Sequence, residues 1–153
     1  MQNRRVAVRG IIIKDGKLLA VRLKQYKGRI DDEGQDFWCV PGGTVDIGEP
    51  LISALEREMT EETGIKPVIG NLLYIQQFAH KDWEHLEFFF HITNADDYAH
   101  IDLDKTTHGA VEIAEIDFID PAAHTLMPMF LRVQDIVADA ASGVTQVFDN
   151  LSF

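Results

Sequence analysis

The stretch GTVDIGEPLISALEREMTEETGI, residues 43–65, decides the fold because it joins a glycine-containing loop to a well-marked helix. Glu58, Glu61 and Glu62 follow one another at i, i+3 and i+4, so their carboxylates share one helix face. Like charges this close repel one another unless a cation lies between them. The spacing therefore predicts a cation site and makes this face the place to look for chemistry.

The helix has clear end signals and a core stripe. Pro50 suits the first helical position, and Gly64 suits the position just past the last turn. Ile52, Leu55 and Met59 are spaced by three and four residues, which predicts the face that packs on the core. The glutamates fall on the adjoining face, so we expect them at the edge of a buried interface.

Before this helix, apolar residues predict strands at residues 4–13, 18–23 and 37–40. The Asp15-Gly16 pair is a turn signal, so the first two strands are expected to form a hairpin. Residues 24–36 are polar and are expected to form an exposed loop.

After the helix, a turn is expected at Gly70-Asn71, and strands are predicted at residues 85–93 and 111–119. A second amphipathic helix is predicted at residues 128–141, ended by Gly143. The aromatic run of residues 85–93 is the strongest strand signal and is expected to be central in its sheet. The mixture indicates an α/β or α+β fold, and no linker divides residues 1–153, so we expect one domain.

The composition is 46% hydrophobic and 25% charged, as in ordinary globular proteins, and contains no run long enough to span a membrane. The net charge of −11 argues against duplex nucleic acid as a partner. The first residues lack a signal-peptide pattern, and the single cysteine, Cys39, excludes an internal disulfide, so we expect a cytoplasmic location. Monomer and homodimer both stay open.

Oxygen ligands dominate the predicted cation site. Glu58, Glu61 and Glu62, with a carbonyl from the Gly42-Gly43 turn, are the ligands that Mg²⁺ or Mn²⁺ prefers. A zinc site is not indicated, because the chain has one cysteine and no pair of histidines at helical ligand spacing. A cation held this way would bind a diphosphate or polyphosphate, and a glutamate left free could act as base on a water molecule.

Basic residues concentrate in the first thirty residues of this acidic chain. Arg22 and Lys24 end the second predicted strand, and they are candidates to contact the phosphates of a substrate. The alternative is that they are charges on the rim of a sheet. Four aromatic residues are candidates to stack on a base, although aromatic residues in strands are more often part of the core: Trp38, Phe78, Trp83 and Phe88.

The spacing of the whole stretch resembles the Nudix box, G-x5-E-x7-R-E-U-x-E-E-x-G-U, where U is a bulky aliphatic residue. Gly43, Glu49, the run 57–59, the pair Glu61-Glu62 and the pair Gly64-Ile65 occupy its fixed positions, with Met59 the loosest match. The preceding Trp38-Cys39-Val40-Pro41-Gly42-Gly43 is similar to the W-x-x-P-G-G of the same family.

The resemblance implies an α/β/α sandwich with a mixed β-sheet between helices, and Mg²⁺- or Mn²⁺-dependent hydrolysis of a nucleoside diphosphate linked to another moiety. By position, Glu58, Glu61 and Glu62 match the metal-binding and base glutamates, and the Gly42 carbonyl matches a further ligand. Glu49 and Arg57 match an ion pair that fixes the loop on the helix.

Relatives often recruit one more acid from outside the box. Glu112 is the first choice for that metal-binding and catalytic acid, and Glu115 is the second.

The substrate is less well specified. The Pro and Tyr markers of ADP-ribose and dinucleoside polyphosphate hydrolases are absent from residues 75–82, which leaves a nucleoside or deoxynucleoside triphosphate or a related nucleotide derivative. Two other functions share this fold. One is a non-catalytic nucleotide-sensing or protein-binding module, disfavoured by the complete set of box glutamates. The other is an isomerase of the isopentenyl diphosphate type, for which Cys39 is more consistent with a core position than with catalysis.

Overall fold

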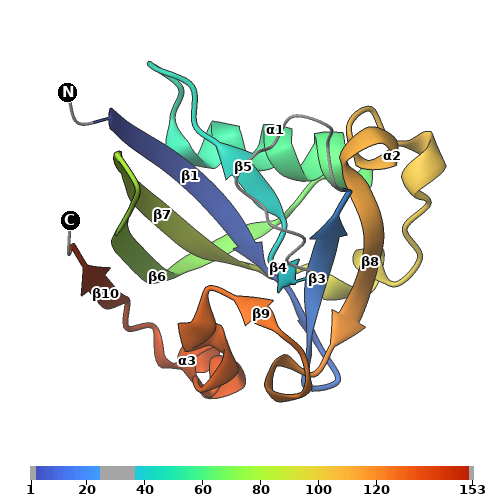
Figure 1. Ribbon diagram of the computed structural model, residues 1–153. Helices are drawn as coiled ribbons and strands as arrows, with labels where there is room; N and C mark the ends of the chain where they lie inside the picture. Colours follow the sequence, from blue (N-terminus) through green and yellow to red (C-terminus); the bar gives the residue numbers. More distant parts are fainter. Residues whose placement is uncertain (1–2, 25–36, 152–153) are drawn as a thin grey trace.

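Two mixed β-sheets form the centre of the computed structural model, which describes residues 3–24 and 37–151. In sheet A, the strand order is β10-β6-β7-β1-β5, and the central strand β7 pairs in parallel with β1 and antiparallel with β6 (Figure 1). The strands of sheet A are β1 (Asn3–Ile11), β5 (Gly42–Thr44), β6 (Ile69–His80), β7 (Trp83–Ile92) and β10 (Gln146–Asn150).

Sheet B is smaller and is built around β3, which pairs antiparallel with β2, β4 and β8. Strand β9 extends this sheet by pairing in parallel with β4. The strands of sheet B are β2 (Ile13–Lys14), β3 (Lys17–Leu23), β4 (Trp38–Cys39), β8 (Ile113–Ile119) and β9 (Leu126–Met127).

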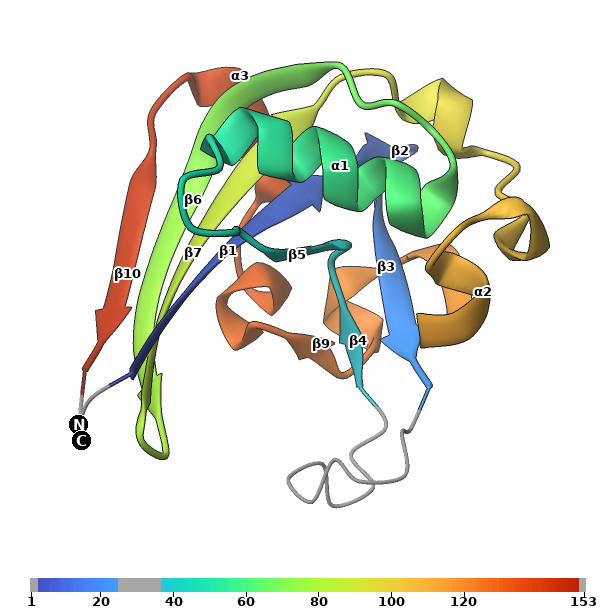
Figure 2. The same cartoon turned by 90° about the horizontal axis from the view of Figure 1, so that it is seen from above.

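Helix α1 (Leu51–Thr63) covers one face of sheet A, and the C-terminal α3 (Ile136–Ser142) lies against the other (Figure 1). The predicted α/β sandwich with a mixed sheet between helices is thus confirmed. Seen from above, α1 runs across the strands of sheet A toward the short helix α2 (Gly109–Glu112) (Figure 2). Short 3₁₀ turns complete the connections: Ala95–Tyr98, Leu103–Lys105, Pro121–Ala123 and Met129–Arg132.

Neighbouring residues of the central strands serve two separate cores. Phe90 packs with Leu55 and Met59 under α1, whereas Phe89 packs with Ile136 of α3 on the other face. Because successive side chains of a strand point to opposite faces, a strand buried on both sides needs a continuous apolar run. The Phe88-Phe89-Phe90 run of β7 follows from this arrangement.

The predicted hairpin is wrong in its extent. The Asp15-Gly16 turn is present, with both residues at positive φ, but it joins only β2 to β3. Strand β1 ends at Ile11 and runs into sheet A, where it pairs with β7 along its whole length. Two partners in sheet A, β5 and β7, replace the one that a hairpin would supply.

Two other predicted elements need correction. Gly70 and Asn71 lie inside β6, where the pairing register shifts, rather than in a turn. The predicted helix at residues 128–141 is split into a 3₁₀ turn and α3, because the Asp135 side chain accepts a hydrogen bond from the Ala138 N–H and starts a new helix there. Gly143 ends α3 in the left-handed conformation, as predicted. The loop predicted at residues 24–36 lies outside the described residues from residue 25 onward.

Within the described ranges, none of the helices combines the length and the apolar character needed to cross a membrane.

Candidate active site

Helix α1 is positioned by its apolar face and by the two residues that flank it. Pro50 lies just before the first helical residue, and Gly64 ends the helix with φ of 76°. Leu55 and Met59 are fully buried, as predicted, but Ile52 is 44% exposed, so its predicted core role is wrong. Ala54 is buried instead, so the buried face of the helix includes Ala54, Leu55 and Met59 and does not include Ile52.

The glycine turn before α1 is required by close backbone approach. Gly42 has φ of 142°, and a Cβ there would lie 2.0 Å from the Val8 carbonyl oxygen. A Cβ on Gly43 would lie 2.4 Å from Glu58 Oε2. Side chains at these two positions would therefore push β5 away from β1 and from the helix that carries the glutamates.

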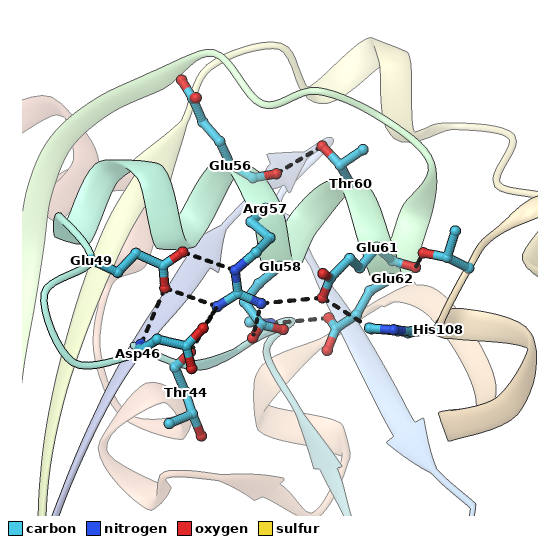
Figure 3. Close-up of polar contacts among 12 residues, drawn as sticks. Thr44, Asp46, Glu49, Glu56, Arg57, Glu58, Thr60, Glu61, Glu62 and His108 are labelled. Carbon is cyan, nitrogen blue, oxygen red and sulfur yellow. Dashed lines mark hydrogen bonds and ion pairs between the residues drawn. The ribbon is translucent and has the colours of Figure 1, made fainter.

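Arg57 connects the loop to the helix glutamates (Figure 3). Its Nε and Nη2 donate to the two carboxylate oxygens of Glu49, each over 2.9 Å, and Nη2 also donates to the Thr44 carbonyl over 3.1 Å. Its Nη1 donates to Glu58 Oε1 over 3.0 Å and to Glu61 Oε2 over 3.3 Å. The guanidinium thus fixes the loop on the helix and offsets part of the carboxylate repulsion.

The hydrogen bonds from Arg57 lower the pKa of Glu49 to about 2, and a hydrogen bond from the Asp46 backbone N–H adds to this effect. In turn, the contact with Glu49 raises the pKa of Arg57. Both groups are consequently charged across the whole physiological range, and the pair acts as a fixed clamp on the loop.

Glu62 is the most deeply buried acid of the helix, at 5% exposure. Burial raises the pKa of its carboxyl group to about 8, although Arg9 and the Gly42 N–H favour the ionised form. Burial also raises the pKa of Glu58, against the opposing effect of Arg57. A desolvated carboxylate next to other carboxylates is an environment that favours binding of a cation.

Glu58, Glu61 and Glu62 open onto a cavity of about 290 Å³ between α1, β3 and β5. Glu112 lies in α2 rather than in the predicted strand, and it lines this cavity together with Glu58, Glu61 and Glu62. Glu115 lies on β8, forms an ion pair with Arg22 and is not part of the lining. The structure therefore places Glu112, the first choice for the acid outside the box, in the same cavity as Glu58, Glu61 and Glu62, and it does not place Glu115 there.

The remaining predicted contacts lie elsewhere. Arg22 is not part of the cavity lining, because its neighbours Val21 and Leu23 on β3 face the cavity and alternate residues of a strand point to opposite sides. Lys24 Nζ donates to the Ala110 carbonyl oxygen over 2.6 Å and is likewise not part of the lining. None of the four aromatic candidates for base stacking lines the cavity.

Two cavity residues were missed by sequence reasoning. His108 Nδ1 lies 2.9 Å from Glu61 Oε2, and its loop approaches α1 closely because Gly109 packs against the Glu62 carbonyl. Arg9 reaches the cavity from β1. A signal existed for Arg9 alone, since it is a charged residue in an otherwise apolar strand.

Cys39 also lines the cavity rather than belonging wholly to the core. Burial raises the pKa of its thiol to about 11, which keeps the group in its neutral, weakly nucleophilic form near pH 7.

The donor set fits a hard divalent cation, because four carboxylates line one cavity beside the glycine turn. Among the residues that the structure describes, however, no three acidic, His or Cys side chains are already grouped to hold a metal ion. Glu58 and Glu61 accept hydrogen bonds from Arg57, and Glu62 accepts one from Gly42. These hydrogen bonds hold the three carboxylates at the cavity and leave acceptor positions on each of them for a cation.

A larger hollow, of about 370 Å³, lies around Tyr98, Ile116 and Phe118 and contains none of the box glutamates. Its lining offers Asp102 and Asp117 as acids, but these lie apart from the glycine turn and the helix. The carboxylate chemistry is thus concentrated in the smaller cavity.

Comparison with known proteins places this arrangement in context. The profile of the NUDIX domain family matches residues 3–133. An ADP-ribose pyrophosphatase of Methanocaldococcus jannaschii is 38% identical over 79 residues, which is 50% of this chain and 42% of that protein. An 8-oxo-dGTP diphosphatase of Haemophilus influenzae is 42% identical over 65 residues, which is 40% of this chain and 47% of that protein. The chain therefore spans less than half the length of these relatives.

Solved structures share the fold at low sequence identity. The E. coli ORF135 protein matches with a TM-score of 0.68 and 21% identity, over 92% of this chain and 94% of that one. The MutT protein of Methanosarcina mazei matches with a TM-score of 0.65 and 22% identity, over 85% of this chain and 89% of that one.

Proposed function

This chain belongs to the NUDIX domain family, and from that premise we propose that it hydrolyses a diphosphate bond in a small nucleotide substrate with the help of Mg²⁺ or Mn²⁺. One observation carries the proposal: Glu58, Glu61, Glu62 and Glu112, from two separate helices, line the same cavity beside a glycine turn. A merely solvated row of helix charges would not converge with an acid from another element.

The roles of the residues follow from their positions. Glu58, Glu61, Glu62 and Glu112, with the Gly42 carbonyl, would hold the divalent cation. When bound, such a cation neutralises charge that develops on the phosphate oxygens and makes a water molecule more acidic. Glu49 and Arg57 hold the loop against the helix, since Arg57 of α1 donates two hydrogen bonds to Glu49 at the end of the loop.

The reaction itself is simple in outline. Water attacks one phosphorus of the diphosphate, the new P–O bond forms, and the bond to the bridging oxygen breaks to release a phosphate-bearing product. A cavity carboxylate accepts the proton that the water loses. Because phosphoryl transfer depends mainly on positioning and on neutralising charge, a rigid cavity of carboxylates suits it.

For the substrate class we propose a nucleoside triphosphate, a deoxynucleoside triphosphate or a related nucleotide diphosphate derivative. Support comes from relatives named ADP-ribose pyrophosphatase, RNA pyrophosphohydrolase and 8-oxo-dGTP diphosphatase. The net charge of −11 disfavours duplex nucleic acid as the substrate. The single cysteine is consistent with the proposed cytoplasmic location.

A product-identified activity screen tests this proposal. The purified protein is incubated with Mg²⁺ and with canonical and oxidised nucleoside triphosphates, ADP-ribose, nucleotide sugars and dinucleotides. We expect Mg²⁺-dependent release of a nucleoside monophosphate or diphosphate from at least one of them. Tight binding of a nucleotide without turnover of any compound would instead support the sensing module.

A further inference from the structure

Arg9 is a cation inside the carboxylate cavity whose presence the box does not explain. It lies on β1, between the buried residues Val8 and Ile11, and its side chain is 17% exposed. Burial lowers the pKa of its guanidinium, but the nearby Glu87, Cys39 and Glu62 together raise it by more, so the pKa is raised overall. Arg9 thus lines the same cavity as Glu58, Glu61 and Glu62 of α1.

The donors of Arg9 are little used compared with those of Arg57. Arg57 makes five hydrogen bonds to the loop and the helix, four of them at 3.1 Å or less. Among the described residues, Arg9 donates only to the Val40 carbonyl and to Glu87 Oε1, and both distances are 3.4 Å, at the outer limit of hydrogen bonding. A guanidinium has five N–H donors, so most of the capacity of Arg9 remains for another acceptor.

Glu87 explains why this cation stays in place. It lies on β7, the strand next to β1, and is only 6% exposed. Its single long contact with Arg9 balances the buried positive charge without occupying the whole guanidinium fork. The pair therefore leaves guanidinium donors of Arg9 available to another acceptor in the cavity that Arg9 lines.

The positive charge of Arg9 favours binding of a phosphate group in this cavity. A phosphate group entering the cavity meets the side chains of four glutamates, and those that are ionised repel it. A planar guanidinium in the cavity lining can donate to two phosphate oxygens at once.

We propose that Arg9 is a substrate-contacting residue that donates hydrogen bonds to non-bridging oxygens of the substrate diphosphate, and that Glu87 is the residue that positions it. This inference rests on the proposed function, since it assumes that a diphosphate occupies the cavity. It adds a binding residue from β1 to a site otherwise built from α1, α2 and the glycine turn.

The test uses methylenediphosphonate, a diphosphate analogue that cannot be hydrolysed, titrated calorimetrically into the whole chain with Mg²⁺ present. Arg9→Ala is expected to weaken binding of this probe by about 10- to 100-fold, the loss typical of charge-assisted hydrogen bonds. Arg9→Lys keeps the charge but not the fork, and is expected to lose less. With the best substrate from the screen, KM rises more than kcat falls, because the contact exists before the reaction begins.

Matched controls separate substrate contact from a structural role. Arg4 and Glu84 form an ion pair at 2.8 Å between the same two strands, and Arg4 is 62% exposed. Arg4→Ala removes an equal charge and is expected to change probe binding by less than about twofold. The double variant Arg9→Gln, Glu87→Gln leaves no charge buried alone, so it keeps the fold and should still lose probe binding.

Unchanged probe binding and unchanged KM in both Arg9→Ala and the double variant would overturn this inference and leave the hydrolase proposal intact. Absence of turnover in the unaltered chain would overturn the hydrolase proposal instead, and the probe titration would still decide whether Arg9 binds a diphosphate. If Arg9→Ala weakens probe binding no more than Arg4→Ala does, the proposed contact between Arg9 and the diphosphate is wrong.

Discussion

The backbone N–H of Gly42 donates a hydrogen bond to Glu62 Oε2 over 3.1 Å, and this contact joins the glycine turn of β5 to helix α1. It places the most buried carboxylate of the helix beside the backbone segment that is expected to share its cation. The turn can come this close only because neither Gly42 nor Gly43 carries a side chain. Backbone shape and carboxylate chemistry thus depend on each other here.

Gly42→Ala should destabilise the chain strongly. The new Cβ would lie 2.0 Å from the Val8 carbonyl oxygen, at a φ of 142° that L residues rarely adopt. Strain of this kind costs about 1–3 kcal/mol before any clash is counted, so we expect the thermal midpoint to fall by at least about 2 °C. Gly48→Ala is the matched control, because Gly48 also has positive φ but open space around it. Equal losses in the two variants would show that the close approach is unimportant.

Arg57→Lys should impair turnover with little loss of fold. Lysine cannot reproduce the paired contacts to Glu49 together with those to Glu58 and Glu61. Losing such charge-assisted hydrogen bonds corresponds to roughly a 10- to 100-fold drop in kcat/KM. Steady-state kinetics measures it, with Arg4→Lys as a control on an exposed pair. An unchanged kcat/KM in Arg57→Lys would show that turnover does not require the contacts of Arg57 with Glu49, Glu58 and Glu61.

The Glu49–Arg57 pair also predicts an acid limb of stability. The pKa of Glu49 is lowered to about 2 from an ordinary value of 4.5, mainly by Arg57. Its contribution is therefore complete above pH 4.5 and is lost as pH falls toward 2. Thermal midpoints measured across this range should fall less steeply in Glu49→Gln than in the unaltered chain, and high salt should narrow the difference. Identical pH profiles would contradict the pairing.

Glu62 predicts the opposite trend at higher pH. Burial raises its pKa from 4.5 to about 8, so between these values the folded chain holds a proton that the unfolded chain has lost. In a chelator, the Glu62 contribution to stability should therefore decline as pH rises from about 5 to 8, and Glu62→Gln should remove that decline. Mg²⁺ affinity should rise over the same window, because the cation needs the ionised carboxylate. Calorimetric titrations at both ends of the window check this.

Leu55→Ala should cost about 2–5 kcal/mol of unfolding free energy, since Leu55 is fully buried under α1. Ile52→Ala should cost less than about 1 kcal/mol, because Ile52 is 44% exposed. Urea unfolding of the two variants measures the difference. Similar losses of unfolding free energy in both variants would contradict this difference and support the predicted core role of Ile52.

Features that depend on residues close together in the sequence were predicted correctly. Gly64 and the spacing of Leu55 and Met59 predicted the helix, and the glutamate offsets predicted their shared face. The Asp15-Gly16 turn was equally visible, because positive φ favours such residues. These features depend on neighbours within a few positions of the chain.

Features that depend on contacts between residues far apart in the sequence were not predicted. Nothing near β1 in the sequence shows that it pairs with β7, some eighty residues later, so the hairpin was extended too far. The same limit concealed Arg9, whose partner Glu87 is equally distant, and His108, whose loop meets Glu61 only in the folded chain. Glu112 was foreseen from its place relative to the family pattern, although its helical setting was not.

Mg²⁺-dependent turnover of Glu62→Gln beside Glu56→Gln tests the central claim most directly. Both residues lie on α1, but Glu56 points away from the cavity (Figure 3). We expect the unaltered chain to need Mg²⁺, Glu62→Gln to lose at least about 100-fold in kcat with its fold intact, and Glu56→Gln to stay within about twofold. Full activity of Glu62→Gln, or turnover undiminished by a chelator, would contradict a catalytic carboxylate cavity at this helix.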